Sequence, residues 1–373
     1  MYLSLNSLRR KPIFILAIIV TFFKSHALDE FFSIDKIEPF KIKGVNGEMY
    51  EKKDIIGELG TALIFFSNHC KISQQFQQYI ITRNKIWSKQ GIKLTVISPN
   101  YEKAILPDEL AFTDAGDSFE EMIARAKAKN YNFPYLYDGE NQIITKSLKV
   151  KITPSAFLFN KLGKLTYCGR LGNHEKPENH ENSEFSKAIR NLLVKDYTYA
   201  RTKVYGTSVK FKKDLDLVER VRKRYAQETV NLNYGDSRKL NFFLKQQTKY
   251  PRFFYIWTIY DNQLQTRENL ISISENYKIF RKRGLKVYTI CICEEKEKEK
   301  ALEILKRAQL STLNFITSAN EISEFSKLRA SEGFKTTPFC KVLYGNGKFD
   351  YGSNGLIDRK SLKNSFLIVL NKD

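Results

Sequence analysis

The chain has 373 residues, of which 42% are hydrophobic and 13% aromatic, so it can form two domains with buried cores and does not have the composition of a disordered protein. The formal net charge is +21, with the basic residues spread along the whole chain. No RNA-recognition motif, zinc-finger spacing or concentrated basic arm occurs in the sequence, which argues against a specific nucleic-acid partner. A solvated cationic surface is the favoured interpretation, and contact with an anionic membrane surface stays open.

The N-terminal segment has the layout of a secretory signal peptide. Arg9, Arg10 and Lys11 precede an apolar run over 12–23, and small residues flank His26 in Ser25-His26-Ala27. The apolar run has about 12 residues, whereas a membrane-spanning helix needs about 20. We therefore expect residues 1–27 to be a signal peptide and the protein to be exported to the periplasm or cell envelope. A retained N-terminal membrane anchor is the alternative.

The first half predicts alternating strands and helices. A hairpin over 40–52 precedes a buried strand over 62–66, and a long amphipathic helix then runs from Cys70 to about Gln90. Ser118 and Glu121 form a capping box that opens a later helix. The other predicted elements are strands over 92–97, 135–137, 155–159 and 164–169, a short helix before 150 and a closing helix over about 183–194.

The second half repeats this order of elements. Gly284 ends a helix there as Gly91 does in the first half, and Thr337-Pro338 matches Thr153-Pro154. The predicted elements are strands over 252–257, 285–293 and 313–316, a strand after Thr337-Pro338, and helices ending at Gly284 and covering 294–309, 320–331 and 359–371. The repeated order predicts a duplication.

Residues 197–249 lack the Gly, Ser and Pro richness of a flexible linker, and helices are expected at 215–227 and 240–247. The sequence therefore predicts a first domain over 28–196, a structured connector over 197–249, and a second domain over 250–373.

A strand that delivers a cysteine to the start of a helix, with Thr-Pro and a hairpin downstream, resembles the thioredoxin fold. More closely, the first half resembles the bacterial redoxin family, peroxiredoxin-like relatives of thioredoxin related to alkyl hydroperoxide reductases. The resemblance covers most of 35–212 and implies an α/β protein with two thioredoxin-like domains, each a central mixed sheet flanked by helices, the second one degenerate. The segments that carry it are Phe66–Cys70, Phe133–Asp138, Thr153–Phe159, Gly163–Arg170 and, in the family's tail, Thr202–Phe211.

The chain departs from its relatives at three positions. Ser73 stands where thioredoxins carry their second cysteine, and Thr207 stands where the tail of the redoxin family commonly has one. The strict peroxiredoxin pattern has Ser or Thr three residues before the cysteine, and Ser67 satisfies this condition. The pattern also has proline seven residues before the cysteine, where this chain has Leu63. The residues therefore exclude a two-cysteine thioredoxin cycle within one site and do not support a peroxiredoxin mechanism.

Cys70 is the predicted nucleophile. A thiol at a helix N-terminus faces unpaired N–H groups and the positive end of the helix dipole, which favours the thiolate, and a protonated His69 would add to this. The resemblance implies a cis proline at Thr153-Pro154, opposite the cysteine, where the backbone can pair with an extended substrate. Ser73 can donate a hydrogen bond to the thiolate but cannot resolve a mixed disulfide, so the site needs an external thiol.

The other four cysteines are expected to be structural, because free cysteine commonly packs in cores. Cys168, Cys291, Cys293 and Cys340 form neither a Cys-x-x-Cys motif nor a zinc-ligand spacing, and we expect no metal and no cofactor. In the second half Asp261 occupies the place of Cys70, where a carboxylate makes a good N-cap. The second domain is therefore predicted to bind a partner rather than to perform chemistry.

The leading hypothesis is an exported, redoxin-like thiol–disulfide oxidoreductase that uses Cys70 alone. Its partners would be a protein thiol or disulfide and an external reductant thiol, with no indication of an oligomeric state. The alternatives are a non-catalytic partner-binding protein with two thioredoxin-like modules and a one-cysteine peroxidase.

Overall fold

The computed structural model describes residues 33–173, 175, 181–322 and 336–371. The predicted signal peptide and most of the helix expected over 320–331 lie outside these residues. The chain divides into two compact units. The first comprises residues up to Tyr101 together with Asp117–Lys210, and the second comprises Glu102–Gly116 together with the chain from Phe211 onward.

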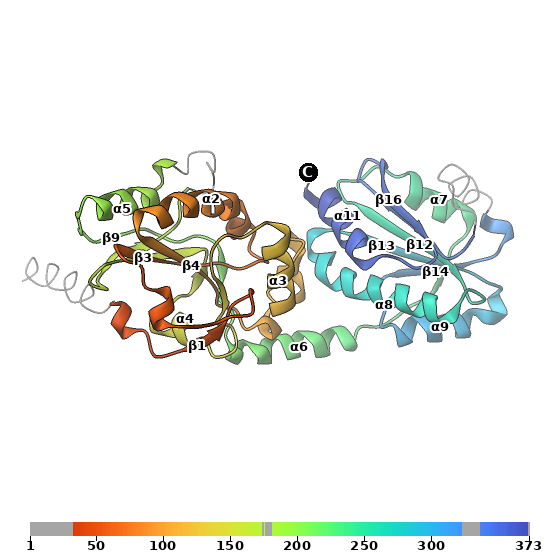
Figure 1. Ribbon diagram of the computed structural model, residues 1–373. Helices are drawn as coiled ribbons and strands as arrows, with labels where there is room; N and C mark the ends of the chain where they lie inside the picture. The colour runs from red at the N-terminus through yellow and green to blue at the C-terminus, as the bar shows by residue number, and fades with distance from the viewer. Residues whose placement is uncertain (1–32, 174, 176–180, 323–335, 372–373) are drawn as a thin grey trace, which may run out of the picture. The chain divides into compact units, whose positions relative to one another are not determined.

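The first unit is built on a mixed six-stranded sheet (Figure 1). Its order is β5-β4-β3-β7-β8-β9, with β3, β4 and β5 parallel and with β7 antiparallel to both β3 and β8. A separate pair joins β6 and β10, and the predicted hairpin is confirmed as β1 and β2. The bounds are β1 (Lys41–Lys43), β2 (Met49–Glu51), β3 (Gly60–Phe65), β4 (Ile92–Ser98), β5 (Tyr135–Tyr137), β6 (Ile152–Thr153), β7 (Ser155–Asn160), β8 (Leu165–Gly169), β9 (Ala200–Arg201) and β10 (Thr207–Ser208).

Helices cover both faces of this sheet. Figure 1 shows α2 and α5 on one face and α4 on the other. Phe76 and Ile80 from α2 share one apolar cluster with Phe185 and Ile189 from α5 and with inward-facing strand residues such as Ile64. The bounds are α2 (Lys71–Trp87), α3 (Phe119–Ala128), α4 (Ile143–Ser147) and α5 (Glu184–Leu193). The predicted capping box is confirmed, because the Ser118 side chain accepts from Glu121 N–H and Glu121 reaches back to Ser118 N–H.

The second unit has a sheet of the same mixed kind. Its order is β11-β14-β13-β12-β15-β16, with β12, β13 and β14 parallel and with β15 antiparallel to both β12 and β16. The central order of three parallel strands followed by an antiparallel pair is thus the same in both units. The bounds are β11 (Asn233–Tyr234), β12 (Arg252–Thr258), β13 (Lys286–Ile292), β14 (Leu313–Thr317), β15 (Phe339–Leu343) and β16 (Phe349–Asn354).

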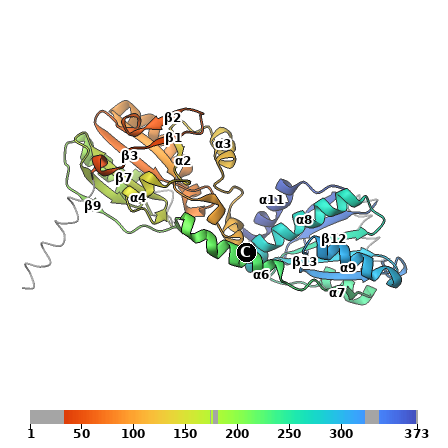
Figure 2. The ribbon, with the colours of Figure 1, turned by 90° about the horizontal axis from the view of Figure 1, so that it is seen from below.

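Two apolar clusters cover the faces of the second sheet. Leu240 and Leu244 of α7 pack with Phe254, Tyr288 and Phe315 on one face. The other face carries α8, α9 and α11, and Figure 2 shows α8 and α7 on opposite sides of β12 and β13. The bounds are α6 (Leu215–Ala226), α7 (Ser237–Lys245), α8 (Gln263–Phe280), α9 (Lys298–Arg307) and α11 (Arg359–Asn371).

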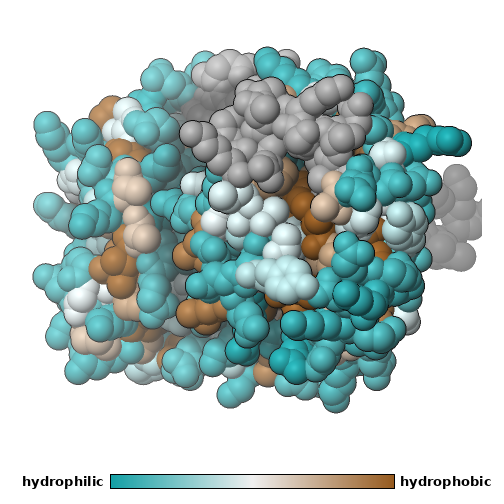
Figure 3. Space-filling view, turned by 90° about the vertical axis from the view of Figure 1, so that its right-hand side faces the viewer, coloured by the Kyte–Doolittle hydropathy of each residue, from teal (hydrophilic) through white to brown (hydrophobic). Residues whose placement is uncertain are grey.

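This architecture confirms the predicted α/β fold class with mixed sheets flanked by helices, and each of the two sheets has six strands. Hydrophilic residues cover most of the face shown in Figure 3, with apolar residues in separate smaller areas. Among the helices that the structure describes, none combines the length and the apolar character needed to cross a membrane.

Candidate functional site

Strand β3 delivers Cys70 to the start of α2. All six residues of β3 are buried between β4 and β7, so the strand direction is fixed by pairing on both edges. Cys70 is the N-cap residue of α2, and its Sγ accepts a hydrogen bond from Ser73 N–H at 3.5 Å. The sulfur thus occupies the place that a Ser or Asp oxygen takes in an ordinary N-cap, facing amide groups that have no partner within the helix.

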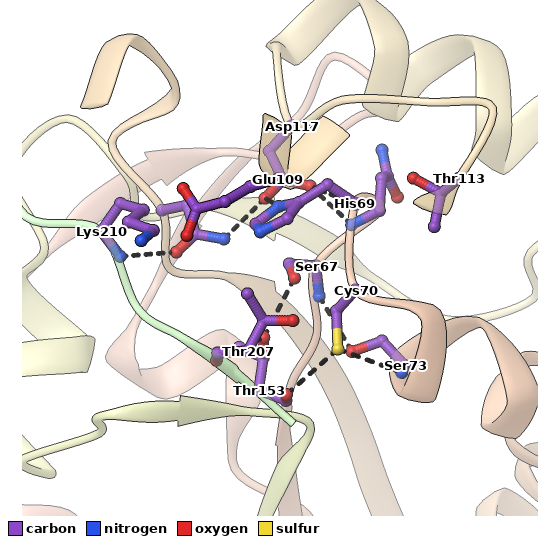
Figure 4. A network of polar contacts seen from close by, with 12 residues as sticks. Ser67, His69, Cys70, Ser73, Glu109, Thr113, Asp117, Thr153, Thr207 and Lys210 are labelled. Atoms are coloured by element: carbon purple, nitrogen blue, oxygen red, sulfur yellow. Dashed lines mark hydrogen bonds and ion pairs between the residues drawn. The ribbon is translucent and has the colours of Figure 1, made fainter. Parts of the chain in front are cut away.

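The segment before Pro154 contacts the same sulfur. The Thr153–Pro154 peptide bond is cis, as predicted. The Cys70 thiol donates to the carbonyl oxygen of Thr153, with Sγ 3.2 Å from that oxygen, and the hydroxyls of Ser67 and Thr153 are hydrogen-bonded at 3.0 Å (Figure 4). The structure therefore brings together Cys70, Ser73 and Thr153, three of the five residues that the sequence singled out.

The contact of Ser73 with sulfur differs from the one predicted. Its backbone N–H faces Cys70, whereas its hydroxyl oxygen accepts from Ser67 N–H at 3.4 Å. The reason is the cap geometry, because the residue three positions after an N-cap points its amide, not its side chain, at the capping atom.

His69 belongs to a buried polar network beside the cysteine. Its Nδ1 lies 2.8 Å from Oδ2 of Asp117, and both side chains are about 1% exposed or less. Asp117 also accepts from the backbone N–H groups of Asn68 and His69 and from the side chain of Asn100 (Figure 4). Burial alone raises the pKa of Asp117, but the charge of His69 and these hydrogen bonds outweigh it, so the net pKa is lowered.

Asp117 was not found from the sequence. It lies 47 positions after Cys70, immediately before the capping box of α3, and no local pattern links it to His69. The network holds the His69 ring and the Ser67–Cys70 segment in place, while His69 Nε2 is buried with no hydrogen-bond partner within the described part of the chain. Asp117 thereby fixes the orientation of the His69 ring.

Cys70 is covered in this structure. Its side chain and backbone together are 1% exposed, and Ser67, His69 and Ser73 are buried as well. Strand β10 lies against β6, with Thr207 paired to Thr153 in antiparallel register, and Thr153 Oγ1 donates to the Thr207 carbonyl oxygen at 3.4 Å. Thr207 therefore lies directly beside the residue that contacts the sulfur (Figure 4).

The remaining cysteines are free thiols in strands or directly after one. Cys291, Cys293 and Cys340 are buried, as expected for core residues, and Cys168 is half-buried. Burial raises the pKa of Cys168 to about 11 and that of Cys340 to about 12. A hydrogen bond with Cys293 and burial both raise the pKa of Cys291. The thiols of Cys168, Cys291 and Cys340 are thus held in the protonated, unreactive form.

The corresponding position of the second unit carries no thiol. The Thr337–Pro338 bond is cis, and Thr337 Oγ1 donates to Oδ1 of Asp261 at 2.7 Å. Asp261 also accepts from the N–H and the hydroxyl of Thr258 at 2.7 and 3.0 Å. The predicted N-cap role of Asp261 was wrong, because the next residue, Asn262, caps α8 by accepting from Gln265 N–H. Asp261 instead ties the end of β12 to the segment before Pro338.

A cavity of about 400 Å³ lies elsewhere in the first unit, lined by residues of β1, β5 and the start of α3. None of the five predicted site residues lines it. No group of three or more His, Cys, Asp or Glu side chains suited to a metal ion occurs within the residues that the structure describes.

Solved structures resemble part of the chain. An uncharacterized conserved protein from Geobacillus kaustophilus is 25% identical over 47% of this chain and 90% of its own, with a TM-score of 0.40. A secreted Mycobacterium tuberculosis disulfide oxidoreductase homologous to E. coli DsbE is 13% identical over 35% and 83%, with a TM-score of 0.28. The bacterioferritin comigratory protein of Xanthomonas campestris is 12% identical over 42% and 92%, with a TM-score of 0.32. No family model and no curated protein matches the chain.

The fold is recognised from the topology of the chain itself. Three parallel strands, an antiparallel pair, a helix that begins after Cys70 and a cis proline beside that cysteine make up the thioredoxin arrangement. The first unit therefore has a thioredoxin-like fold.

Proposed function

We propose that the chain is a thiol–disulfide exchange protein with Cys70 as its nucleophile. The observation that carries the proposal is the position of Sγ, between the first free amide groups of α2 and the Thr153 carbonyl before Pro154. Amide groups at a helix start stabilise a thiolate, and a thiolate is the form of cysteine that attacks a disulfide.

The reaction has two steps. The Cys70 thiolate attacks one sulfur of a partner disulfide, forms a Cys70–partner bond, and releases the other partner sulfur as a thiolate. A thiol from an external reductant or from the partner then attacks the mixed disulfide, which returns Cys70 as a thiolate and leaves the new disulfide on the partner side. Ser73 has no sulfur to perform this second step, so Cys70 depends on the second thiol.

His69 and Asp117 are assigned to proton transfer in this cycle. Before attack the Cys70 thiol donates to Thr153, so a proton has to leave the sulfur. His69 directly precedes Cys70 in the chain, and Asp117 fixes its ring orientation. We assign His69 a proton-exchange role and Asp117 a positioning role through His69.

The second unit is assigned a binding role. It has Asp261 in place of a nucleophile, and three apolar side chains nearby are strongly exposed, namely Tyr260 at 73%, Leu264 at 66% and Leu356 at 54%. Contiguous exposed apolar patches mark protein-contact sites, whereas scattered single side chains are ordinary surface, so the binding role rests first on the missing nucleophile. We place the protein in the cell envelope, as its N-terminal sequence predicts.

The proposal is tested with 5,5′-dithiobis(2-nitrobenzoic acid), a disulfide whose thiolate product is coloured. Because Cys70 is 1% exposed, we expect the full chain to release one equivalent of product slowly through Cys70 and to keep the other half of the reagent as a stable adduct. The Cys70→Ala variant, which keeps the other four cysteines, should lose this equivalent. Equal release from both proteins would refute the proposal.

A second candidate is a non-catalytic binding protein, and the 1% exposure of Cys70 favours it. Under that hypothesis the Cys70→Ala variant fully supports the cellular role of the protein. A peroxidase, the third hypothesis, would consume hydrogen peroxide rapidly when an external thiol is supplied.

A further inference from the structure

Residues 202–210 form a strap that crosses the front of the candidate site. We propose that the strap occupies the backbone edge at which the partner's extended segment has to pair, so that Cys70 becomes reactive when such a segment displaces it. This inference rests on the proposed function and adds the class of partner, an extended polypeptide that carries the disulfide, and a built-in competitor for it.

The strap is anchored at both ends. At its start, Thr202 donates its N–H to Cys168 O at 3.1 Å and accepts from Arg170 N–H at 3.0 Å. At its end, Val209 N–H donates to Lys151 O at 2.8 Å, and Lys210 N–H donates to Asn100 Oδ1 at 2.8 Å. The segment between the anchors is therefore held at a defined place rather than left as a free loop.

The middle of the strap lies on the strand edge next to Cys70. Thr207 and Ser208 pair antiparallel with Thr153 and Ile152, which are the two residues before Pro154. A strand edge presents unpaired N–H and C=O groups to any extended chain, and pairing with it is a common mode of peptide recognition. Here the protein's own chain fills that edge, so a partner segment and the strap exclude each other.

Gly206 brings the strap onto the oxygen that contacts the sulfur. A Cβ atom at Gly206 would lie 1.8 Å from the Thr153 carbonyl oxygen, and this oxygen also accepts the Cys70 thiol. The backbone of Gly206 has φ +152°, in a region that other residues rarely adopt. The close approach is thus possible only for glycine, and it places the strap against the carbonyl group that contacts the Cys70 sulfur.

The middle of the strap is only weakly held. Lys203, Gly206 and Ser208 are exposed and Tyr205 is 39% exposed, whereas Val209 is buried at the anchored end. Segments with few buried apolar contacts open at lower free energy than the core around them. Release of residues 203–208 therefore uncovers Cys70 without unfolding β3 or α2.

The test measures the rate at which iodoacetamide alkylates Cys70 in the full chain, with the site identified by peptide mass spectrometry. Gly206→Ala introduces the clash, and Val209→Pro removes the hydrogen bond to Lys151, so the second variant serves if the first does not fold. Gly47→Ala is the matched control, because Gly47 also has a positive φ, +88°, but nothing lies within 4 Å of its Cβ position.

We expect alkylation of Cys70 to be at least about tenfold faster in both strap variants, the change that corresponds to about 1.4 kcal/mol of lost pairing. The control should react at the wild-type rate, and hydrogen exchange over 203–209 should increase in the strap variants only. Unchanged alkylation in a strap variant whose hydrogen exchange shows the strap released would overturn the inference. Faster alkylation in the strap variants, together with no disulfide adduct on Cys70, would support the strap inference and reject the proposed exchange function.

Discussion

The Sγ atom of Cys70 lies 3.2 Å from the carbonyl oxygen of Thr153. Thr153 is also the residue of β6 that pairs with Thr207 of β10. This one carbonyl group joins the helix start, the segment before Pro154 and the strap. The contact places Cys70 beside the segment before Pro154, as the proposed thiol–disulfide site requires. It also links the covering of Cys70 to the strap that pairs with Thr153. The sulfur chemistry, the buried contact between His69 and Asp117, and the second unit can each be tested.

Restoring a second thiol should convert the site into a dithiol one. In a Ser73→Cys variant, the new thiol follows Cys70 by three residues, at the position of the second cysteine of thioredoxins. We expect the chain to release two equivalents of coloured product from 5,5′-dithiobis(2-nitrobenzoic acid) rather than one, because the introduced thiol displaces the adduct from Cys70. A Ser73→Ala variant is the control and should still release one. A single equivalent from Ser73→Cys would show that its side chain cannot reach the sulfur.

The pair of His69 and Asp117 should make the first unit's stability depend on pH. The lowered pKa of Asp117 means that its contribution is present above the unfolded value of 3.8 and is lost as the pH falls through the folded value. We expect Asp117→Asn to lower the free energy of unfolding by about 3 kcal/mol near neutral pH, since a buried partner is left uncompensated. The difference from wild type should shrink at pH values below 3.8.

That stability can be measured on the full chain. The sequence has two tryptophans, Trp87 in the first unit and Trp257 in the second. In a Trp257→Phe background, the denaturant-induced change in fluorescence therefore reports on the first unit. A difference between Asp117→Asn and its parent that stays constant from neutral pH to about pH 2, well below the unfolded value, would contradict the stabilising role of the Asp117 carboxylate.

Cys168 and Cys340 should resist alkylation in the native chain. Their pKa values of about 11 and about 12 leave only about one thiolate in a thousand or fewer at pH 8. We expect mass spectrometry to find both unmodified after brief treatment with iodoacetamide at pH 8 and modified after treatment in denaturant. Rapid labelling of Cys168 in the native chain would show that the Cys168 thiol in β8 is accessible and reactive, and Cys168 would then compete with Cys70 as a nucleophile.

Asp261 should contribute to the stability of the second unit but not to the rate of disulfide exchange at Cys70. An Asp261→Ala variant loses the acceptor of three hydrogen bonds from Thr258 and Thr337, which is expected to cost about 1–2 kcal/mol of that unit's stability. The rate of disulfide exchange at Cys70 should stay at the wild-type value. Fluorescence of Trp257 in a Trp87→Phe background measures the stability, and a fall in the exchange rate would show that Asp261 acts in the chemistry.

The placement of Cys70 could be predicted because its signals are local. A run of apolar residues, a cysteine and an amphipathic helix in direct succession specify a buried strand and a helix start. The hydrogen bond between Cys70 and Thr153 spans 83 residues, and the resemblance to redoxins, rather than any periodicity, predicted that the two would meet.

The sequence did not reveal the strap or the role of Asp117. Strands β6 and β10 have two residues each, too few for an alternating pattern, and their pairing depends on where the chain returns after β9. Asp117 lies in a loop between short helical elements, and its link to His69 is purely tertiary. Asp261 and Asn262 are both good N-caps, and the sequence does not show at which of the two the helix begins.

The most direct measurement follows whether the Cys70 sulfur forms a covalent adduct with a disulfide-containing peptide. The full chain is mixed with a short extended peptide that carries a cystine, and intact mass with peptide mapping follows the adduct over time. We predict a covalent adduct on Cys70 that persists until glutathione is added and then disappears with recovery of the free thiol. Absence of any adduct on Cys70, even in the Gly206→Ala variant with the strap released, would contradict the proposed exchange chemistry.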